Sequence, residues 1–206
     1  MSKIFCGILV FFFSLSCLSY GIQSADTNIQ NSEQAKALVA DMLNGSLQKI
    51  NVPGISDKDV KDFFEEQVKT RFALDKLVKF VLGPYFPKLT EEQKNKIFVP
   101  CFINMLVKFY TSNFKEYKKA AFKIITVRTI SGGAFCIETK VLVPGKKDNV
   151  LIWIIVSTND GFKIMDIIFE NVSVRTIQKA EIRGAISSSK NGFDGFLQSF
   201  LQKYGN

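Results

Sequence analysis

The 206-residue sequence contains no histidine, only four cysteines and a single tryptophan. Because histidine is the commonest general base and metal ligand near neutral pH, its absence removes the usual starting point for acid–base and metal chemistry. The two cysteines beyond residue 20, Cys101 and Cys136, fall short of the four ligands of a structural zinc site. No GxSxG, P-loop or dinucleotide-binding glycine pattern is present. The composition favours a protein that is not an enzyme and has no cofactor.

Long apolar runs are also missing after the first 20 residues. No later segment reaches the roughly 18 consecutive apolar residues that can cross a bilayer core of about 30 Å. At the start, Lys3 precedes an apolar run at residues 4–13, and Ser19 and Gly21 are small residues at cleavage positions. This pattern is typical of a secretory signal peptide. We expect a signal peptide at residues 1–21, cleaved after Gly21, and a single soluble, exported domain at residues 22–206.

The state of the cysteines is left open by the sequence. Cys17 follows Ser16 as an acylated lipoprotein cysteine would, but Ser14 stands where a lipobox has a branched aliphatic residue, so lipidation is the lesser alternative. Cys101 lies on an apolar helical face and Cys136 in a strand-like run. Buried free thiols are the commoner outcome there, although an oxidising compartment would permit a disulfide.

Basic residues outnumber acidic ones by 27 to 19, which gives a formal net charge of +8. The excess is dispersed over many lysines and does not form an arginine-rich stripe. Export argues against a nucleic-acid partner. The charge either attracts anionic lipid head groups at a membrane surface or is an ordinary solvated surface.

Helical periodicity dominates the chain up to about residue 117. Apolar residues recur at spacings of three and four and predict helices at residues 32–47, 56–68, 74–82 and 91–110. Residues 22–31 are polar and are expected to be loose.

Several residues mark the ends of these helices. Ser56 begins the second helix, Gly83 suits the left-handed residue that closes the third, and Thr90 with Gln93 forms a capping box before the fourth. Pro100 deprives the Lys96 carbonyl of its helical donor, at about 3 kcal/mol. It therefore predicts a kink between residues 97 and 101.

Beyond residue 119 the apolar period changes from 3.6 to 2. The alternation predicts strands at residues 122–130, 135–143, 150–156 and 162–169, joined by short turns. The third of these is apolar on both sides, contains Trp153 and is expected to be covered on both faces. Two more helices follow, at residues 172–187 and 193–204. The first of them is expected to bury Val174, Ile177, Ile182, Ala185 and Ile186. The order of elements predicts an α+β domain with a four-stranded antiparallel sheet.

Two blocks carry a family resemblance. Residues 81–117, VLGPYFPKLTEEQKNKIFVPCFINMLVKFYTSNFKEY, contain a leucine-glycine-x-tyrosine pattern and a threonine-initiated helix. Residues 164–200 contain a strand end, a long helix and a terminal G-x-D-G helix start. Matching positions are Asp166, Glu170, Val172, Ser173, Gly192, Asp194 and Gly195. These blocks resemble the MlaC (toluene-tolerance) family. The chain departs from its pattern at Asn171, where the family has glycine, and at Gln178 and Lys179, where it has tyrosine and arginine.

The resemblance implies a cone-shaped, strongly curved sheet wrapped by about six to seven helices, with an apolar cavity between sheet and helices. It implies a periplasmic phospholipid carrier that shuttles lipid between an outer-membrane lipoprotein and porin complex and an inner-membrane ABC transporter complex. The phospholipid would be cargo, held by a monomer without cofactor, metal or catalytic residues.

Apolar residues on the inner faces of the predicted helices and strands are the candidates to line such a cavity. Each taken singly is more often plain core, and only their number favours a cavity. They are Leu77, Val81, Tyr85, Phe98, Phe102, Leu106, Ile137, Val141, Ile152, Ile154 and Ile167. Lys88 is a candidate to meet a lipid phosphate at the mouth.

Two other classes of protein remain open. A ketosteroid-isomerase-like enzyme on a similar cone-shaped sheet would place a buried carboxylate, with Asp166 the best candidate and Glu170 on the same strand face, in a polar-floored pocket. The simpler interpretation is that Asp166 bonds to backbone or a lysine and Glu170 caps the next helix. A secreted adhesion module would have a packed core and an exposed apolar patch.

Overall fold

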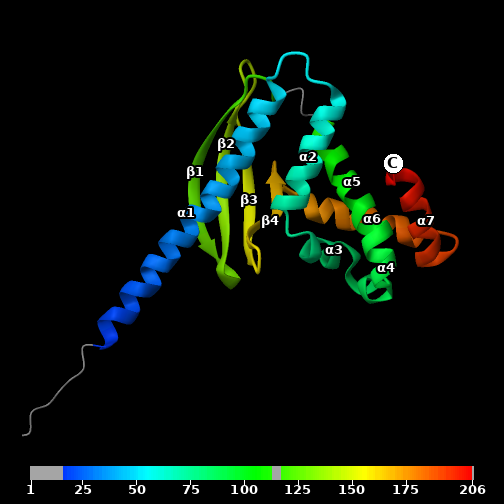
Figure 1. The fold of residues 1–206 in the computed structure, drawn as a ribbon, viewed down its shortest axis with the longest axis horizontal. Coiled ribbons are helices and arrows are strands. Elements are labelled where there is room, and N and C mark those ends of the chain that lie inside the picture. The colour runs from blue at the N-terminus through cyan, green and yellow to red at the C-terminus, as the bar shows by residue number, and fades with distance from the viewer. Residues whose placement is uncertain (1–15, 113–116, 206) are drawn as a thin grey trace, which may run out of the picture.

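The computed structural model describes residues 16–112 and 117–205, with side chains from residue 27 onward. The fold is α+β, with helices packed against an open antiparallel sheet (Figure 1). The helices are α1 (Ser16–Ile50), α2 (Asp57–Arg71), α3 (Leu74–Leu82), α4 (Glu91–Gln93), α5 (Val99–Thr111), α6 (Val174–Ser188) and α7 (Gly192–Tyr204). The strands are β1 (Ala121–Ile130), β2 (Ala134–Leu142), β3 (Asn149–Thr158), β4 (Gly161–Phe169) and β5 (Val172–Ser173).

The sheet has five strands, in the order β1-β2-β3-β4-β5, where the sequence predicted four. The additional strand, β5, is only two residues long and pairs with the end of β4. Periodicity cannot reveal so short a strand, and the sequence placed these residues at the start of the following helix. Helix α6 begins after them, and the Ser173 side chain caps it by accepting a hydrogen bond from the backbone N–H of Thr176.

The strand register separates the apolar residues of the sheet into two sets. Ile137 of β2 lies opposite Trp153 of β3, which lies opposite Ile167 of β4, and all three are buried. Ile152 and Ile154 alternate with Trp153 and therefore lie on the other face, where both are half-buried. The prediction that β3 is covered on both faces is wrong, because one face of the strand is partly open to solvent.

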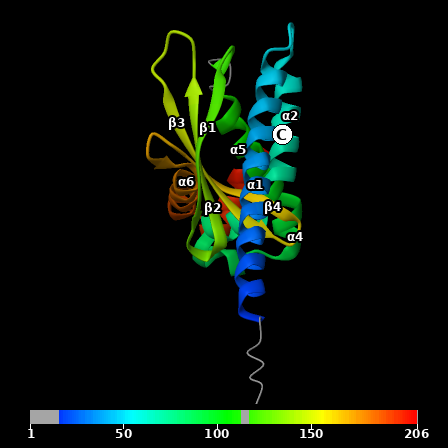
Figure 2. The same ribbon diagram turned by 90° about the vertical axis from the view of Figure 1, so that its left-hand side faces the viewer.

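Helix α1 is longer than predicted. Residues 22–31, expected to be loose, belong to this continuous helix, which lies along the sheet and projects beyond it (Figures 1 and 2). Its buried residues are Ala35, Val39, Met42, Leu43, Ser46 and Ile50, and the first four recur at helical spacings. Residues 1–15 of the expected signal peptide lie outside the described residues, and the expected cleavage position after Gly21 falls within α1.

The predicted helix starts at Ser56 and Thr90 and the predicted helix end at Gly83 are confirmed, whereas α2 continues to Arg71, beyond the predicted residue 68. The hydroxyl of Ser56 accepts a hydrogen bond from the Asp59 N–H at 3.1 Å, and Thr90 and Gln93 make both bonds of the capping box. Gly83 closes α3 with a φ of 53°, in the region that favours glycine. These signals are local, so the sequence alone is sufficient to locate them.

Regular helical bonding is interrupted close to Pro100. The segment Lys94–Phe98 is π-helical, and the Val99 N–H donates to the Lys94 carbonyl, five residues back. Pro100 then falls in the first turn of α5, where its missing N–H is tolerated. The sequence predicted a kink between residues 97 and 101, and the structure instead shows a change of bonding pattern at Lys94–Phe98, mostly ahead of that range.

Aromatic stacking joins α7 to the π-helical segment Lys94–Phe98, which precedes α5. Phe98 stacks on Phe200 at 5.3 Å between ring centroids, and Phe196 stacks on Phe200 at 5.2 Å. On the same side, Tyr85 stacks on Phe193 at 5.7 Å. These rings form an aromatic core around α7.

Cys101 and Cys136 are both buried and both free thiols, so they do not form a disulfide. Desolvation raises the pKa of the Cys101 thiol. None of the helices in the described part of the chain has the length and apolar character needed to cross a membrane.

Candidate functional site

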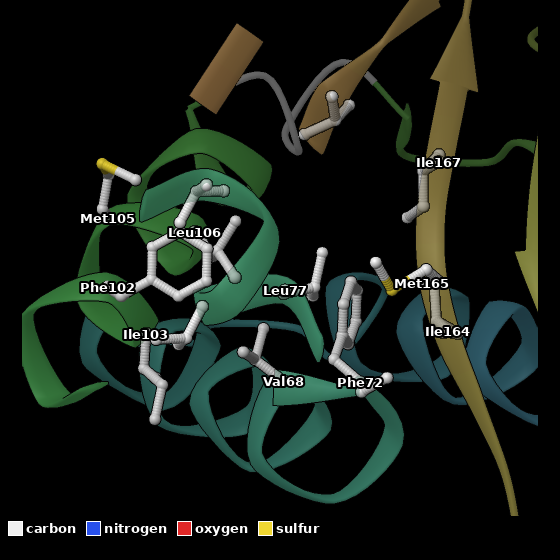
Figure 3. Packing of buried hydrophobic residues seen from close by; sticks show 14 of the residues in the cluster. Val68, Phe72, Leu77, Phe102, Ile103, Met105, Leu106, Ile164, Met165 and Ile167 are labelled. Carbon is white, nitrogen blue, oxygen red and sulfur yellow. The ribbon is translucent and has the colours of Figure 1, made fainter. Parts of the chain in front are cut away.

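A small internal void lies between β4 and the helices α3, α5 and α6. Its volume is about 10 Å³, room for about one water molecule. The lining residues are Phe72, Leu77, Phe102, Leu106, Tyr110, Met165, Asp166, Ile167, Val174, Arg175 and Gln178. Figure 3 shows Ile164, Met165 and Ile167 on the strand facing Phe72, Leu77 and Leu106 on the helical side.

Most of the wall is apolar. Phe102 and Leu106 lie four residues apart on α5 and therefore share one face of the helix. Leu77 comes from α3 and Ile167 from β4, so the apolar wall joins the helical layer to the sheet. All four side chains are buried. An acyl chain inserted here would meet hydrocarbon from both layers.

The polar end of the void is built around Asp166, which is 4% exposed. One carboxylate oxygen accepts a hydrogen bond from the Arg175 backbone N–H at 3.1 Å, and the other accepts from the Ser173 hydroxyl at 2.7 Å. Arg175 Nε lies 3.2 Å from the second oxygen. Asp166 therefore fixes the start of α6 to β4, as the simpler interpretation of this carboxylate predicts. Glu170 does not cap α6; it lies in the preceding turn with a φ of 48°.

Cation–π contacts tie α6 to α3. The Arg175 guanidinium and the Lys179 ammonium lie over the Phe80 ring, 4.7 and 4.4 Å from its centroid. Across the void, burial and, to a lesser degree, the Asp166 charge raise the pKa of Tyr110. The phenol therefore keeps its proton and can donate a hydrogen bond near neutral pH.

Gln178 is the unexpected member of the lining. Its side chain is 1% exposed, and its amide oxygen has no hydrogen-bond partner among residues 16–112 and 117–205. The sequence assigned Ile177 and Ala185 to the buried face of α6, but both are exposed. Gln178 completes the buried series Val174, Gln178, Ile182 and Ile186. A strict spacing of four from Val174 to Ile182 was the signal that would have identified it.

The eleven predicted lining residues divide into several groups. Leu77, Phe102, Leu106 and Ile167 line the void. Val81, Ile137 and Val141 are buried elsewhere, and Tyr85 and Phe98 belong to the aromatic core shared with α7. Ile152 and Ile154 lie on the opposite face of the sheet. The structure therefore brings four of the predicted residues together at one site. Sequence reasoning missed Phe72, Tyr110, Met165, Val174, Arg175 and Gln178 as lining residues.

An open cleft of about 540 Å³ adjoins the void, and Phe72 lines both. The cleft also contains Lys69, Lys76 and Lys163. At Phe72 the chain is pinned to β4, because the Ala73 N–H donates to the Ile164 carbonyl at 2.9 Å. Lys88, predicted at the mouth, lines neither space and lies over the Tyr85 ring at 5.2 Å.

These features define an α+β protein whose helices and open antiparallel sheet enclose a mostly apolar void with one polar end. The family model described as MlaC protein matches residues 34–202. The chain belongs to the MlaC family.

The fold is similar to that of the phospholipid-binding protein from Ralstonia solanacearum, whose structure was determined in complex with a phospholipid. The identity is 16%, the TM-score is 0.66, and the match covers 84% of this chain and 97% of that chain. No curated protein matches the sequence. Within the described ranges, no group of three or more His, Cys, Asp or Glu side chains could hold a metal ion.

Proposed function

We propose that this protein is a periplasmic phospholipid carrier that holds acyl chains between α5 and β4. The observation that supports it most is the apolar wall of Leu77, Phe102, Leu106 and Ile167, which joins both layers of an MlaC-family fold. The carrier acts as a monomer. It shuttles lipid between an outer-membrane lipoprotein and porin complex and an inner-membrane ABC transporter complex.

Lipid uptake requires the two layers to separate. Sites for small molecules commonly enclose about 300–1,000 Å³, whereas the void measures about 10 Å³. The acyl chains therefore need more room than the void provides, and on binding they replace contacts between helices and sheet.

The energetics favour such an exchange. Each buried methylene contributes about 0.8 kcal/mol, so a chain of roughly 15 methylenes gains on the order of 10 kcal/mol on leaving water. Breaking apolar contacts across the site offsets part of this gain. The walls that separate still face hydrocarbon in the loaded state, so their burial is largely kept.

The test is to purify the protein from cells and identify lipid in an organic extract by mass spectrometry. We expect phospholipid in stoichiometric amount from the unmodified chain. Leu106→Trp fills the site and is expected to reduce the recovered lipid several-fold. The matched control is Leu201→Trp on α7, where the side chain is 43% exposed, and this variant should carry lipid normally.

A bulky residue in the core also strains the fold, at about 1–3 kcal/mol. Leu106→Ala separates the two effects, because it destabilises the chain by about 2–5 kcal/mol while enlarging the void. It is expected to retain lipid. Absence of lipid from the unmodified protein, together with failure to take lipid from vesicles, would refute the proposed function.

A further inference from the structure

Two buried polar atoms at the void make no hydrogen bond within the described chain. They are the amide oxygen of Gln178, an acceptor, and the Nε–H of Arg175, a donor that is ion-paired with Asp166 at 3.2 Å without the geometry of a hydrogen bond. Arg175 and Gln178 lie three residues apart on α6, so their side chains are neighbours on one face of the helix. Both residues line the void. Buried polar atoms in proteins are nearly always hydrogen-bonded, so a further group completes this pair.

The chemistry of the pair limits what that group can be. A methylene can satisfy neither atom, and an ester carbonyl can only accept. A hydroxyl both donates and accepts, so it can donate to Gln178 and accept from Arg175 at once.

The position of the pair indicates which part of a lipid it meets. The Arg175 side chain is 31% exposed, so it marks the side of the void nearest to solvent. Gln178 is 1% exposed, and it lines the same void as the buried Leu77 and Leu106 of the apolar wall. A lipid with its chain along that wall would place its chain–head-group junction beside the pair.

We propose that Gln178 and Arg175 form a recognition site for a hydroxyl at the junction between the acyl chain and the polar part of the cargo. The inference rests on the proposed function and specifies its substrate class. The hydroxyl can belong to the glycerol of a monoacyl phospholipid or to a hydroxylated acyl chain.

The test is a competition experiment on the delipidated, purified protein, read by native mass spectrometry. Three probes share one phosphoglycerol head group: a dipalmitoyl lipid, the same lipid with one 3-hydroxypalmitoyl chain, and a monopalmitoyl lipid. We expect about tenfold tighter binding of at least one hydroxyl-bearing probe over the dipalmitoyl lipid, the ratio that one additional hydrogen bond provides. The probe that binds more tightly than the dipalmitoyl lipid shows whether the recognised hydroxyl belongs to the glycerol or to the acyl chain.

Gln178→Met removes the acceptor at nearly constant side-chain length and should abolish this ratio. Gln178→Leu should do the same, which guards against a variant that folds poorly. The matched control is Gln198→Met on the exposed side of α7, which should keep the ratio.

Equal binding of all three probes, with water alone completing the pair, overturns this inference and leaves the proposed function standing. A preference that survives in both Gln178 variants also overturns it. If none of the three lipids binds, the proposed function itself fails.

Discussion

Both oxygens of the buried Asp166 carboxylate make structural contacts. Its two oxygens accept hydrogen bonds from the Arg175 backbone and from Ser173, and its charge faces the Arg175 guanidinium. A general base needs an oxygen that is free to take a proton from a substrate. The bonding pattern instead makes Asp166 the link between β4 and α6.

Asp166→Ala is therefore expected to lower the free energy of unfolding by about 3 kcal/mol. It leaves the Arg175 side chain without its counter-charge and removes the bonds at the start of α6. Urea denaturation measures the change. Glu170→Ala, at an exposed position in the preceding turn, is the control and should alter stability by less than about 0.5 kcal/mol. Equal effects of the two substitutions would contradict the structural role of Asp166.

Unlike the hydrogen-bonded carboxylate of Asp166, the buried amide oxygen of Gln178 has no hydrogen-bond partner within the described chain. Gln178→Met replaces a buried unsatisfied polar group with an apolar one of similar length. The lipid-free protein should gain about 1 kcal/mol, a rise in Tm of about 2–4 °C for a chain of this size. Thermal unfolding followed by circular dichroism measures it. A lowered Tm would mean that the amide is satisfied in the empty protein.

The helix starts can be predicted from local sequence, whereas the shortest strand cannot. Thr90 with Gln93 and Ser56 with Asp59 bond within one helical turn, so their residue types alone indicate the helix starts. The two-residue strand β5 exists only because the end of β4 lies beside it. Its pairing depends on tertiary structure, so no local pattern could predict it.

The candidate site was only partly predictable for the same reason. Alternation places Ile137 and Ile167 on the inner face correctly, but the sequence does not show where β3 stands relative to its neighbours. A bulge between Ile154 and Ile155 shifts that register. Likewise, Phe98 has the helical spacing of a lining residue. Only the docking of α7 assigns it to the aromatic core.

A substitution at Phe98 tests whether this residue supports the aromatic core and not the lipid site. Phe98→Ala is expected to destabilise the protein by about 3–5 kcal/mol, because it opens a cavity between α5 and α7. The folded fraction should still carry the normal amount of lipid. The measurements are urea denaturation and the lipid content of the folded protein. Loss of lipid without loss of stability would place Phe98 at the lipid site instead.

At the scale of the whole molecule, the helical layer is fastened to the sheet beside the void. Phe72 forms a bridge with Ile164 of β4, the Ala73 N–H donates to the Ile164 carbonyl, and Lys76 donates to the Ser157 carbonyl at 3.0 Å. Phe72 also separates the void from the lysine-containing cleft. Separation of the layers at this point would join the two spaces.

A disulfide across this junction should hold the protein closed. Bridged residues have Cα atoms within the range that a disulfide spans, so Phe72→Cys combined with Ile164→Cys can form the cross-link. We expect the oxidised variant to take up lipid from vesicles at least tenfold more slowly than the same variant after reduction. The reduced form is the internal control for both substitutions. Equal rates in the two forms would show that lipid enters without separation at Phe72.

The central claim is that the small void opens to receive acyl chains. The most direct measurement is a crystal structure of the protein loaded with phospholipid. We predict acyl density between α5 and β4, in contact with Leu77, Phe102, Leu106 and Ile167, and a site enlarged to several hundred Å³. Lipid bound on the outer surface, with the void still about 10 Å³, would contradict the account.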